Sequence, residues 1–293
     1  MKSLIILSII IFSSQYVINE NEISYLKQKA PFTVYNYEEN PFKSYSETEL
    51  KNLFQSNIPE KKTFLKKFPF FSKKNDLPES YDIREKWPSC IQRIWENPRC
   101  GSVTLPSVTA FSNRVCIGTL GKMTTQLSLQ QIISCDPSSP KCETGGLAFT
   151  AWQFFKSNGV VDSLCYPFEG KESDCDNKCK NGDEWKVYKA SSIYSLNNID
   201  DIKNDLFNYG YVEATFTVYS DFINYQRGIY QHTTGSLMGN HSVVIVGWGV
   251  QNGIRYWICQ NSWGRSWGED GYFRIKMGEC GIDSNAYAGI YEK

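Results

Sequence analysis

The fold is decided by two stretches, Asn240-His241-Ser242-Val243-Val244-Ile245-Val246-Gly247-Trp248 and Gln260-Asn261-Ser262-Trp263-Gly264. The first predicts a buried strand that a histidine opens, because β-branched residues follow His241 and a glycine turn ends the run. The second predicts a strand end that enters a glycine turn. An Asn placed 20 residues after a His can orient its imidazole, and an adjacent Trp can shield the bond from water. A core histidine is the usual alternative, but this flanking pattern favours a catalytic one.

Composition indicates a globular protein and gives no reason to expect a charged partner. Of the 293 residues, 41% are hydrophobic and 21% are charged. The 31 Lys and Arg residues balance 31 Asp and Glu residues, so neither nucleic acid nor an anionic membrane surface is expected to bind. The only histidines are His232 and His241, which leaves no basis for a His-rich metal site, and we expect no metal and no cofactor. Ten cysteines would need a metal or redox explanation in the cytosol, but simply pair in an oxidising compartment.

The N-terminus has the pattern of a secretory signal peptide. Met1-Lys2 precedes an apolar run from Ser3 to Phe12, and small residues follow. The run is too short to span a bilayer, so we predict a signal peptide over residues 1–19 rather than a membrane-tethering helix. The chain is therefore expected to enter the secretory pathway and to reach the extracellular space or a lysosome or vacuole.

Residues 20–76 are predicted to form a pro-segment. All ten cysteines lie between Cys90 and Cys280. A helix is predicted over residues 46–54, because Ser46 and Glu49 form a capping box. A lysine-rich stretch over residues 61–74 then resembles an exposed processing linker, although an ordinary helix and loop would have the same composition.

Beyond Leu77 the pattern changes from helices to strands. Helices are predicted at residues 107–117, 128–134 and 145–157, and strands at 211–218, 242–248, 255–259 and 271–275. This order indicates an α+β protein with a helical lobe over about residues 90–190 and a β lobe over about residues 191–293.

The sequence from about residue 77 to 290 resembles the cathepsin B group of the papain family. Residues 77–90 are similar to the mature start of cathepsin B. The segments at 100–102, 112–117, 134–135 and 145–146, and the His and Asn blocks, follow in family order. The resemblance implies a peptidase domain over residues 77–293 with a papain-like two-lobed fold: a helical lobe, then an antiparallel β-barrel-like lobe, with the cleft between them. It also implies a cysteine nucleophile paired with His241 and Asn261, with Trp263 as the shield.

The nucleophile itself is missing. The family signature is C-G-S/A-C-W/Y, whereas this chain reads Cys100-Gly101-Ser102-Val103-Thr104-Leu105-Pro106. Counting from Cys100 places Val103 at the nucleophile position, and counting back from Cys116 places Ser102 there. A serine is much harder to ionise than a thiol, and a valine cannot attack at all. Cys100 is an improbable substitute, because the resemblance pairs it with Cys142.

Two further departures weaken the expected site. Pro106 lacks an N–H, so the helix is predicted to begin near Thr104 or Leu105 and its dipole to miss the nucleophile position. By resemblance, Asn97 takes the place of the oxyanion-hole glutamine and is one methylene shorter. Losing one such donor costs on the order of 100-fold in rate.

The resemblance also implies a substrate groove and four disulfides. Gly145 and Gly146 match the glycine pair that admits a substrate backbone. Asp283 matches an acidic residue at the base of a specificity pocket, with a solvated surface acid as the alternative. The loop over residues 165–179 contains no His, so exopeptidase trimming is not expected. The implied pairs are Cys90–Cys116, Cys100–Cys142, Cys135–Cys175 and Cys165–Cys179; Cys259 and Cys280 remain, as thiols or a fifth pair.

Two hypotheses follow. The first is an inactive, secreted or lysosomal peptidase homologue that is a monomer and binds a peptide or protein segment in its cleft. Homologues with serine in place of the cysteine, such as the tubulointerstitial nephritis antigen family, set a precedent. The second is a working endopeptidase that uses Ser102, or whose nucleophile is hidden by an error in this stretch of sequence.

Overall fold

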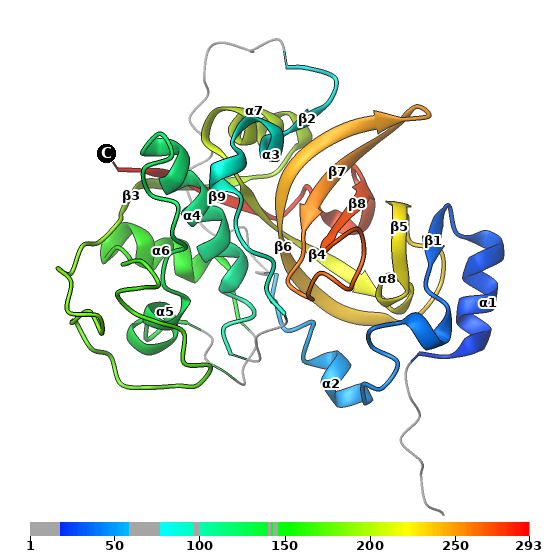
Figure 1. The fold of residues 1–293 in the computed structure, drawn as a ribbon. Helices are drawn as coiled ribbons and strands as arrows, with labels where there is room; N and C mark the ends of the chain where they lie inside the picture. The colour runs from blue at the N-terminus through cyan, green and yellow to red at the C-terminus, as the bar shows by residue number, and fades with distance from the viewer. Residues whose placement is uncertain (1–17, 59–76, 97–99, 140–141, 143–145, 293) are drawn as a thin grey trace, which may run out of the picture.

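The chain folds into a helical lobe and a β lobe, and its N-terminal segment lies along the β lobe and between the two (Figure 1). The computed structural model describes residues 18–58, 77–96, 100–139, 142 and 146–292. The predicted signal peptide up to residue 17 and the lysine-rich linker therefore lie outside the described residues. The α+β class is confirmed.

The helical lobe contains the three helices predicted for it. They are α4 (Leu105–Gly118), α5 (Leu129–Cys135) and α6 (Phe149–Ser157). The central helix α4 is buried along nearly its whole length. Short helices α2 (Glu47–Lys51) and α3 (Ile83–Lys86) lie outside this lobe, and α2 has the predicted Ser46–Glu49 capping box.

The β lobe is an open sheet, so the predicted barrel-like closure is wrong. The strand order is β1-β5-β8-β7-β6-β4-β9-β3, and β2 pairs with β6. All pairs are antiparallel except β5 with β8. The sheet stays open because its two edge strands, β1 from the N-terminal segment and β3, do not pair with each other. Its strands are β1 (Phe32–Val34), β2 (Tyr81–Asp82), β3 (Ala190–Leu196), β4 (Val212–Tyr219), β5 (Tyr225–Tyr230), β6 (Leu237–Gln251), β7 (Ile254–Gln260), β8 (Tyr272–Lys276) and β9 (Ala286–Tyr291).

Strand β6 is longer than predicted, because it continues through the glycines at both ends of its apolar run. At Gly247 the backbone of β2 approaches so closely that a Cβ would lie 2.5 Å from the Tyr81 carbonyl oxygen. A residue without a side chain is therefore required where β2 pairs with β6.

Several elements were not predicted from the sequence. The helices among them are α1 (Glu20–Lys29), α3, α7 (Ile199–Tyr209) and the short α8 (Ser220–Ile223), and the strands are β1, β2, β3, β5 and β9. Only three residues of α7 are buried, namely Ile202, Leu206 and the carboxylate of Asp205. Two apolar residues among many Asp and Asn residues are too few to predict a helix from periodicity. Helix α1 begins at its N-cap Asn19, inside the stretch assigned to the signal peptide.

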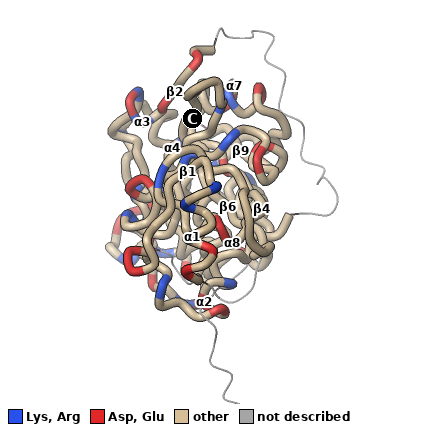
Figure 2. The backbone as a smooth tube through the Cα atoms, turned by 90° about the vertical axis from the view of Figure 1, so that its right-hand side faces the viewer, with Lys and Arg blue, Asp and Glu red and all other residues tan. Residues whose placement is uncertain are grey.

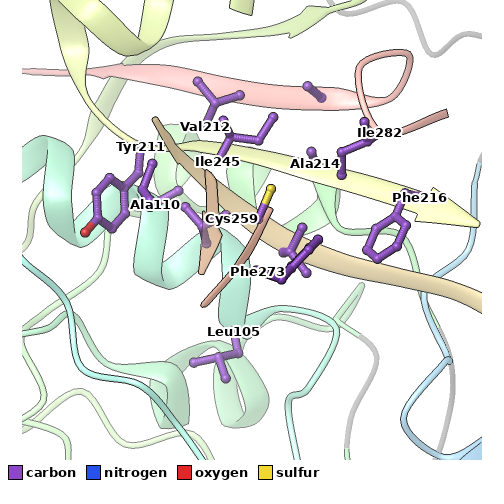
Figure 3. Packing of buried hydrophobic residues seen from close by; sticks show 14 of the residues in the cluster. Leu105, Ala110, Tyr211, Val212, Ala214, Phe216, Ile245, Cys259, Phe273 and Ile282 are labelled. Carbon is purple, nitrogen blue, oxygen red and sulfur yellow. The ribbon is translucent and has the colours of Figure 1, made fainter. Parts of the chain in front are cut away.

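The four disulfides implied by the resemblance are all present. Cys259 and Cys280 are free, so the alternative of a fifth pair is wrong. Figure 3 shows the Cys259 sulfur within the core of the β lobe, near Ile245 and Phe273. Burial raises the pKa of the Cys259 thiol, which behaves as a small apolar side chain.

Charged residues of both signs are interspersed over the face that carries α1 and β1 (Figure 2). This mixture agrees with the balanced composition. Among the described residues, no helix combines the length and apolar character needed to cross a bilayer.

Candidate active site

His241 and Asn261 meet at the centre of the molecule, as the sequence predicted. The Nε2 atom of His241 lies 2.8 Å from Oδ1 of Asn261. The same Oδ1 accepts the Ser262 backbone N–H at 2.8 Å, which turns the amide oxygen toward the ring. Nε2 is therefore the donor in this hydrogen bond, and Nδ1 is the ring nitrogen that a nucleophile would use.

An aromatic wall covers this pair. The indole of Trp263 stacks on the imidazole at a centroid distance of 4.9 Å, and Phe216 packs against the ring from β4. His241 is 4% exposed. Burial is the main reason that the pKa of His241 falls to about 4, and the polar contacts with Asn261 and the Leu53 backbone only partly oppose it. The ring is thus neutral over most of the physiological range.

The segment that should supply the nucleophile forms a turn before α4. Gly101 adopts a φ of +74°, and its carbonyl accepts the N–H groups of Thr104 and Leu105. Val103 is buried, and Ser102 is partly exposed. No hydrogen bond joins the Ser102 hydroxyl to His241 within the described part of the chain. Cys100 is bonded to Cys142, so its sulfur is not a free thiol.

The helix start agrees with the prediction made from Pro106. Helix α4 begins at Leu105, with Thr104 at the N-cap and without a side-chain cap. Leu105 and Pro106 line a narrow cavity together with Ser242 and Asn261, so apolar side chains face the dyad from this end of the helix. The Thr104 hydroxyl donates back to the Gly101 carbonyl, which keeps it within its own turn.

The chain's own residues 53–57 occupy the cleft. The Ser56 N–H donates to the Asn240 carbonyl at 3.2 Å, and the Asn57 N–H donates to the Gly146 carbonyl at 2.7 Å. The Gly146 N–H donates in turn to the Gln55 carbonyl at 3.2 Å. This short stretch is therefore hydrogen-bonded to both sides of the cleft.

Aromatic side chains from the same N-terminal segment seal the dyad. Phe54 lies 6.3 Å from the His241 ring and 5.6 Å from the Trp263 ring, in edge-on contacts. Phe42 adds an edge-on contact with Trp263 at 5.4 Å. At Gly239 a Cβ would lie 2.7 Å from the Phe54 carbonyl oxygen, so this glycine permits the close approach.

The sequence did not identify these N-terminal residues as part of the site. The helix predicted over residues 46–54 would have included Leu53 and Phe54, but the helix ends at Lys51 and the chain then extends into the cleft. The break in helical geometry after Asn52 depends on contacts with the two lobes, which local sequence does not encode. The one feature of the sequence that could have indicated this buried contact is the apolar pair Leu53-Phe54.

The remaining predicted site residues fall into two groups. Asn97 and Gly145 lie outside the described residues, so their predicted functions stay predictions. Asp283 is buried, and its Oδ2 accepts the Gly278 N–H at 2.7 Å and lies 3.5 Å from Trp257 Nε1. The alternative of a solvated surface acid is therefore wrong; the predicted place in a specificity pocket stays a prediction, since the hydrogen bonds found for Asp283 are structural.

No cluster of three or more His, Cys, Asp or Glu side chains that could hold a metal occurs in the part of the chain that the structure describes. His232 instead lies beside the buried carboxylate of Asp221, with Nδ1 at 3.2 Å from Oδ2, and stacks on Tyr219.

A model of the papain family of cysteine proteases matches residues 77–290. Cathepsin B-like CP2 of Giardia intestinalis is 37% identical over an alignment of 235 residues that covers 76% of this chain and 77% of that protein. Cathepsin B-like cysteine proteinase 6 of Caenorhabditis elegans is 36% identical over 253 residues, covering 73% of this chain and 67% of that protein.

Among solved structures, proCathepsin B S9 from Trypanosoma congolense matches with a TM-score of 0.86 and 29% identity, covering 94% of this chain and 99% of that one. The match includes the N-terminal segment as well as both lobes, since only a small part of either chain is left uncovered. This chain belongs to the papain family of cysteine proteases and is a cathepsin B-like homologue within it.

Proposed function

We propose that this chain is a catalytically inactive cathepsin B-like protein that acts by binding a peptide or protein segment in its cleft. The observation that carries the proposal is the absence of a cysteine at either candidate nucleophile position, Ser102 or Val103. The other residues of the site are retained, because His241, Asn261 and Trp263 pack the junction between the lobes whether or not catalysis occurs.

The other cysteines give no substitute. Eight of the ten are in disulfides. The two free thiols, Cys259 and Cys280, lie on the β lobe, and burial raises the pKa of Cys280 to about 12. A thiol needs a lowered pKa and access to the histidine to act as a nucleophile, and neither condition is met by these two.

The cleft occupant supports a binding function. Residues 55–57 bond to both sides of the cleft through main-chain groups, a mode of recognition that any extended peptide could use. We infer that the pro-segment over residues 20–76 blocks the cleft as in a zymogen, and that its release exposes the groove. The cysteine-rich composition and the cathepsin B-like relatives support a secretory route to the cell exterior or a lysosome. We expect a monomer that needs no cofactor.

A working peptidase is the second candidate, and one observation favours it. The His241–Asn261 hydrogen bond at 2.8 Å under a Trp263 shield has the geometry that a functional general base requires. Ser102 would then be the nucleophile.

Amidase activity on an Arg-containing peptide at mildly acidic pH distinguishes the two. The secreted chain is assayed before and after limited proteolysis within residues 59–76, with His241→Ala as the blank. We expect no turnover above the His241→Ala level, because no thiolate can form at the helix start. Robust turnover that depends on His241 would overturn the proposal, and loss of that turnover in Ser102→Ala would identify the serine as nucleophile.

A further inference from the structure

We propose that Asn240 is a site of N-linked glycosylation at the rim of the cleft, directly before the family histidine. Asn240-His241-Ser242 is the only Asn-X-Ser/Thr triplet without an intervening proline in the 293-residue chain. This triplet is the acceptor for N-linked sugar in proteins of the secretory pathway. The inference rests on the secretory route included in the proposed function.

The side chain of Asn240 is partly exposed. Asn240 is half-buried, whereas His241 is 4% exposed, because successive residues of β6 point to opposite faces of the sheet. Its Oδ1 accepts a hydrogen bond from the Thr217 hydroxyl at 3.3 Å. Its Nδ2, the atom that would carry the sugar, donates a hydrogen bond to none of the described residues. This nitrogen is also not fully buried. Nδ2 therefore contacts solvent.

The order of events follows from Ser242. Its hydroxyl is buried and lies 2.7 Å from the Thr215 hydroxyl across the β4–β6 pair. A glycosyl-transferring enzyme can read this hydroxyl only while β6 is still an extended, unpaired chain, so the sugar must be added before the β lobe closes. In that step Nδ2 loses a proton and bonds to C1 of an oligosaccharide, whose bond to a lipid pyrophosphate breaks and releases that lipid.

A sugar at Asn240 would stand where residues 55–57 cross the β lobe. Gln55 forms an isolated parallel bridge with Asn240, and Ser56 donates to its carbonyl at 3.2 Å. The main-chain atoms make these contacts, so the side chain remains available. The main-chain groups of Asn240 and Gly146 would stay open to an extended peptide, since the sugar is carried by the side chain. An oligosaccharide here would therefore flank a bound peptide, as it would flank the pro-segment.

The test compares the full chain secreted from a eukaryotic cell with three variants. Ser242→Thr keeps both the triplet and a hydroxyl opposite Thr215, Ser242→Ala removes both, and Asn240→Gln removes the acceptor but keeps Ser242. We expect digestion with a peptide N-glycosidase to shift the mobility of the native chain and of Ser242→Thr. The mobility of Ser242→Ala and Asn240→Gln should not change, and peptide mapping should find residue 240 converted to Asp only in the first pair.

An unshifted native chain and an unshifted Ser242→Thr variant would overturn the inference. If Ser242→Ala is not recovered because the Thr215 contact is lost, Asn240→Gln carries the comparison, since it retains that contact. The amidase assay separates the two ideas. A glycosylated chain with His241-dependent activity overturns only the proposed function, and an unglycosylated inactive chain overturns only this inference.

Discussion

At the scale of single residues, the site keeps the histidine that would accept a proton but lacks the cysteine that would attack the substrate. Asn261 orients His241, whose ring also contacts the Leu53 backbone, but the residues that precede α4 bring no thiol to it. The helix start is also altered, since Leu105 and Pro106 occupy its first turn. The nucleophile, the helix dipole and the oxyanion donor act as a unit in catalysis. When one of them is lost, the other two therefore contribute much less to the rate.

Restoring only the thiol should therefore recover little. We expect Ser102→Cys to react with a thiol-directed peptidyl inhibitor at nearly the rate of the Ser102→Cys, His241→Ala double variant. The reason is that a cysteine in this turn does not lie at the start of α4, so its pKa stays close to that of an ordinary thiol. The measurement is the rate of covalent labelling of the introduced thiol after the pro-segment has been removed.

A matched variant restores the family's C-G-S-C-W spacing together with Asn97→Gln. It should label at least about ten times faster than Ser102→Cys, because all three elements return. Equal labelling of the two variants, or strong His241-dependent labelling of Ser102→Cys alone, would contradict the threefold explanation.

At the scale of elements, the N-terminal segment is part of the fold and does more than cover it. Strand β1 extends the sheet beside β5, and Tyr35 bonds through its hydroxyl to the Ser266 carbonyl and the Gly268 N–H. Residues 53–57 then enter the cleft and bury His241. Because burial lowers the pKa of His241 to about 4, docking of this segment is linked to pH.

Acidification is expected to weaken that docking. With His241 exposed the ring titrates near its ordinary pKa, and with the segment docked it titrates near 4. Docking is therefore fully favourable above about pH 6.5 and loses about 1.4 kcal/mol per pH unit as pH falls toward 4. Glu22 of α1, which bonds to Ser220, acts in the opposite direction, since burial raises its pKa.

The measurement is co-elution of the segment with the two lobes after proteolysis within residues 59–76, at about pH 7 and about pH 4.5. His241→Gln is the matched control, because an amide can still bond to its neighbours but does not titrate. We expect acid to release the segment from the native chain and much less from His241→Gln. Equal release from both would show that another group controls docking.

At the scale of the whole molecule, a buried carboxyl joins the lobes. Glu213 on β4 accepts hydrogen bonds from the Ser107 hydroxyl of α4 at 2.7 Å and from the Trp152 indole of α6 at 2.6 Å. It is fully buried, and its Oε1 has no hydrogen-bond partner among the described residues. Burial raises the pKa of Glu213 to about 8, so the folded protein holds it protonated at neutral pH. Nearby, Arg114 and Asp205 form a buried ion pair that ties α4 to α7.

The contribution of Glu213 to the stability of the fold should therefore be larger in acid than at slightly alkaline pH. The unfolded chain ionises Glu213 above about pH 4.5, whereas the folded chain does so only near pH 8, so stability falls by about 1.4 kcal/mol per pH unit between them. Glu213→Gln resembles the neutral acid and should abolish this fall. We expect the variant to have a higher Tm than the native chain at about pH 7.5 and a similar Tm at about pH 4.5.

The control for this prediction is Glu47→Gln. Glu47 pairs with Lys51 on the exposed surface of α2, so its replacement should leave the pH profile of the Tm unchanged. A Glu213→Gln variant with the same pH profile as the native chain would mean that Glu213 is ionised in the folded state.

The sequence by itself determined the family fold, the His241–Asn261 pair, the start of α4 near Leu105 and the four disulfides. The His241–Asn261 pair and the helix start follow from short motifs that the chain carries locally, whereas the fold and the disulfide pairs were implied by the resemblance to the papain family. Pro106, for example, limits where a helix can begin whatever surrounds it.

Only the tertiary structure decided what fills the cleft, how the sheet ends and which acids are buried. Leu53 and Phe54 look like the apolar face of a helix until both lobes are in place to bind an extended chain there. No sequence pattern predicts the burial of Glu213, and the sequence left open whether Asp283 is solvated until packing removed water from both acids. Such features arise from contacts between residues far apart in the sequence, and their free energies are set by burial that no local pattern records.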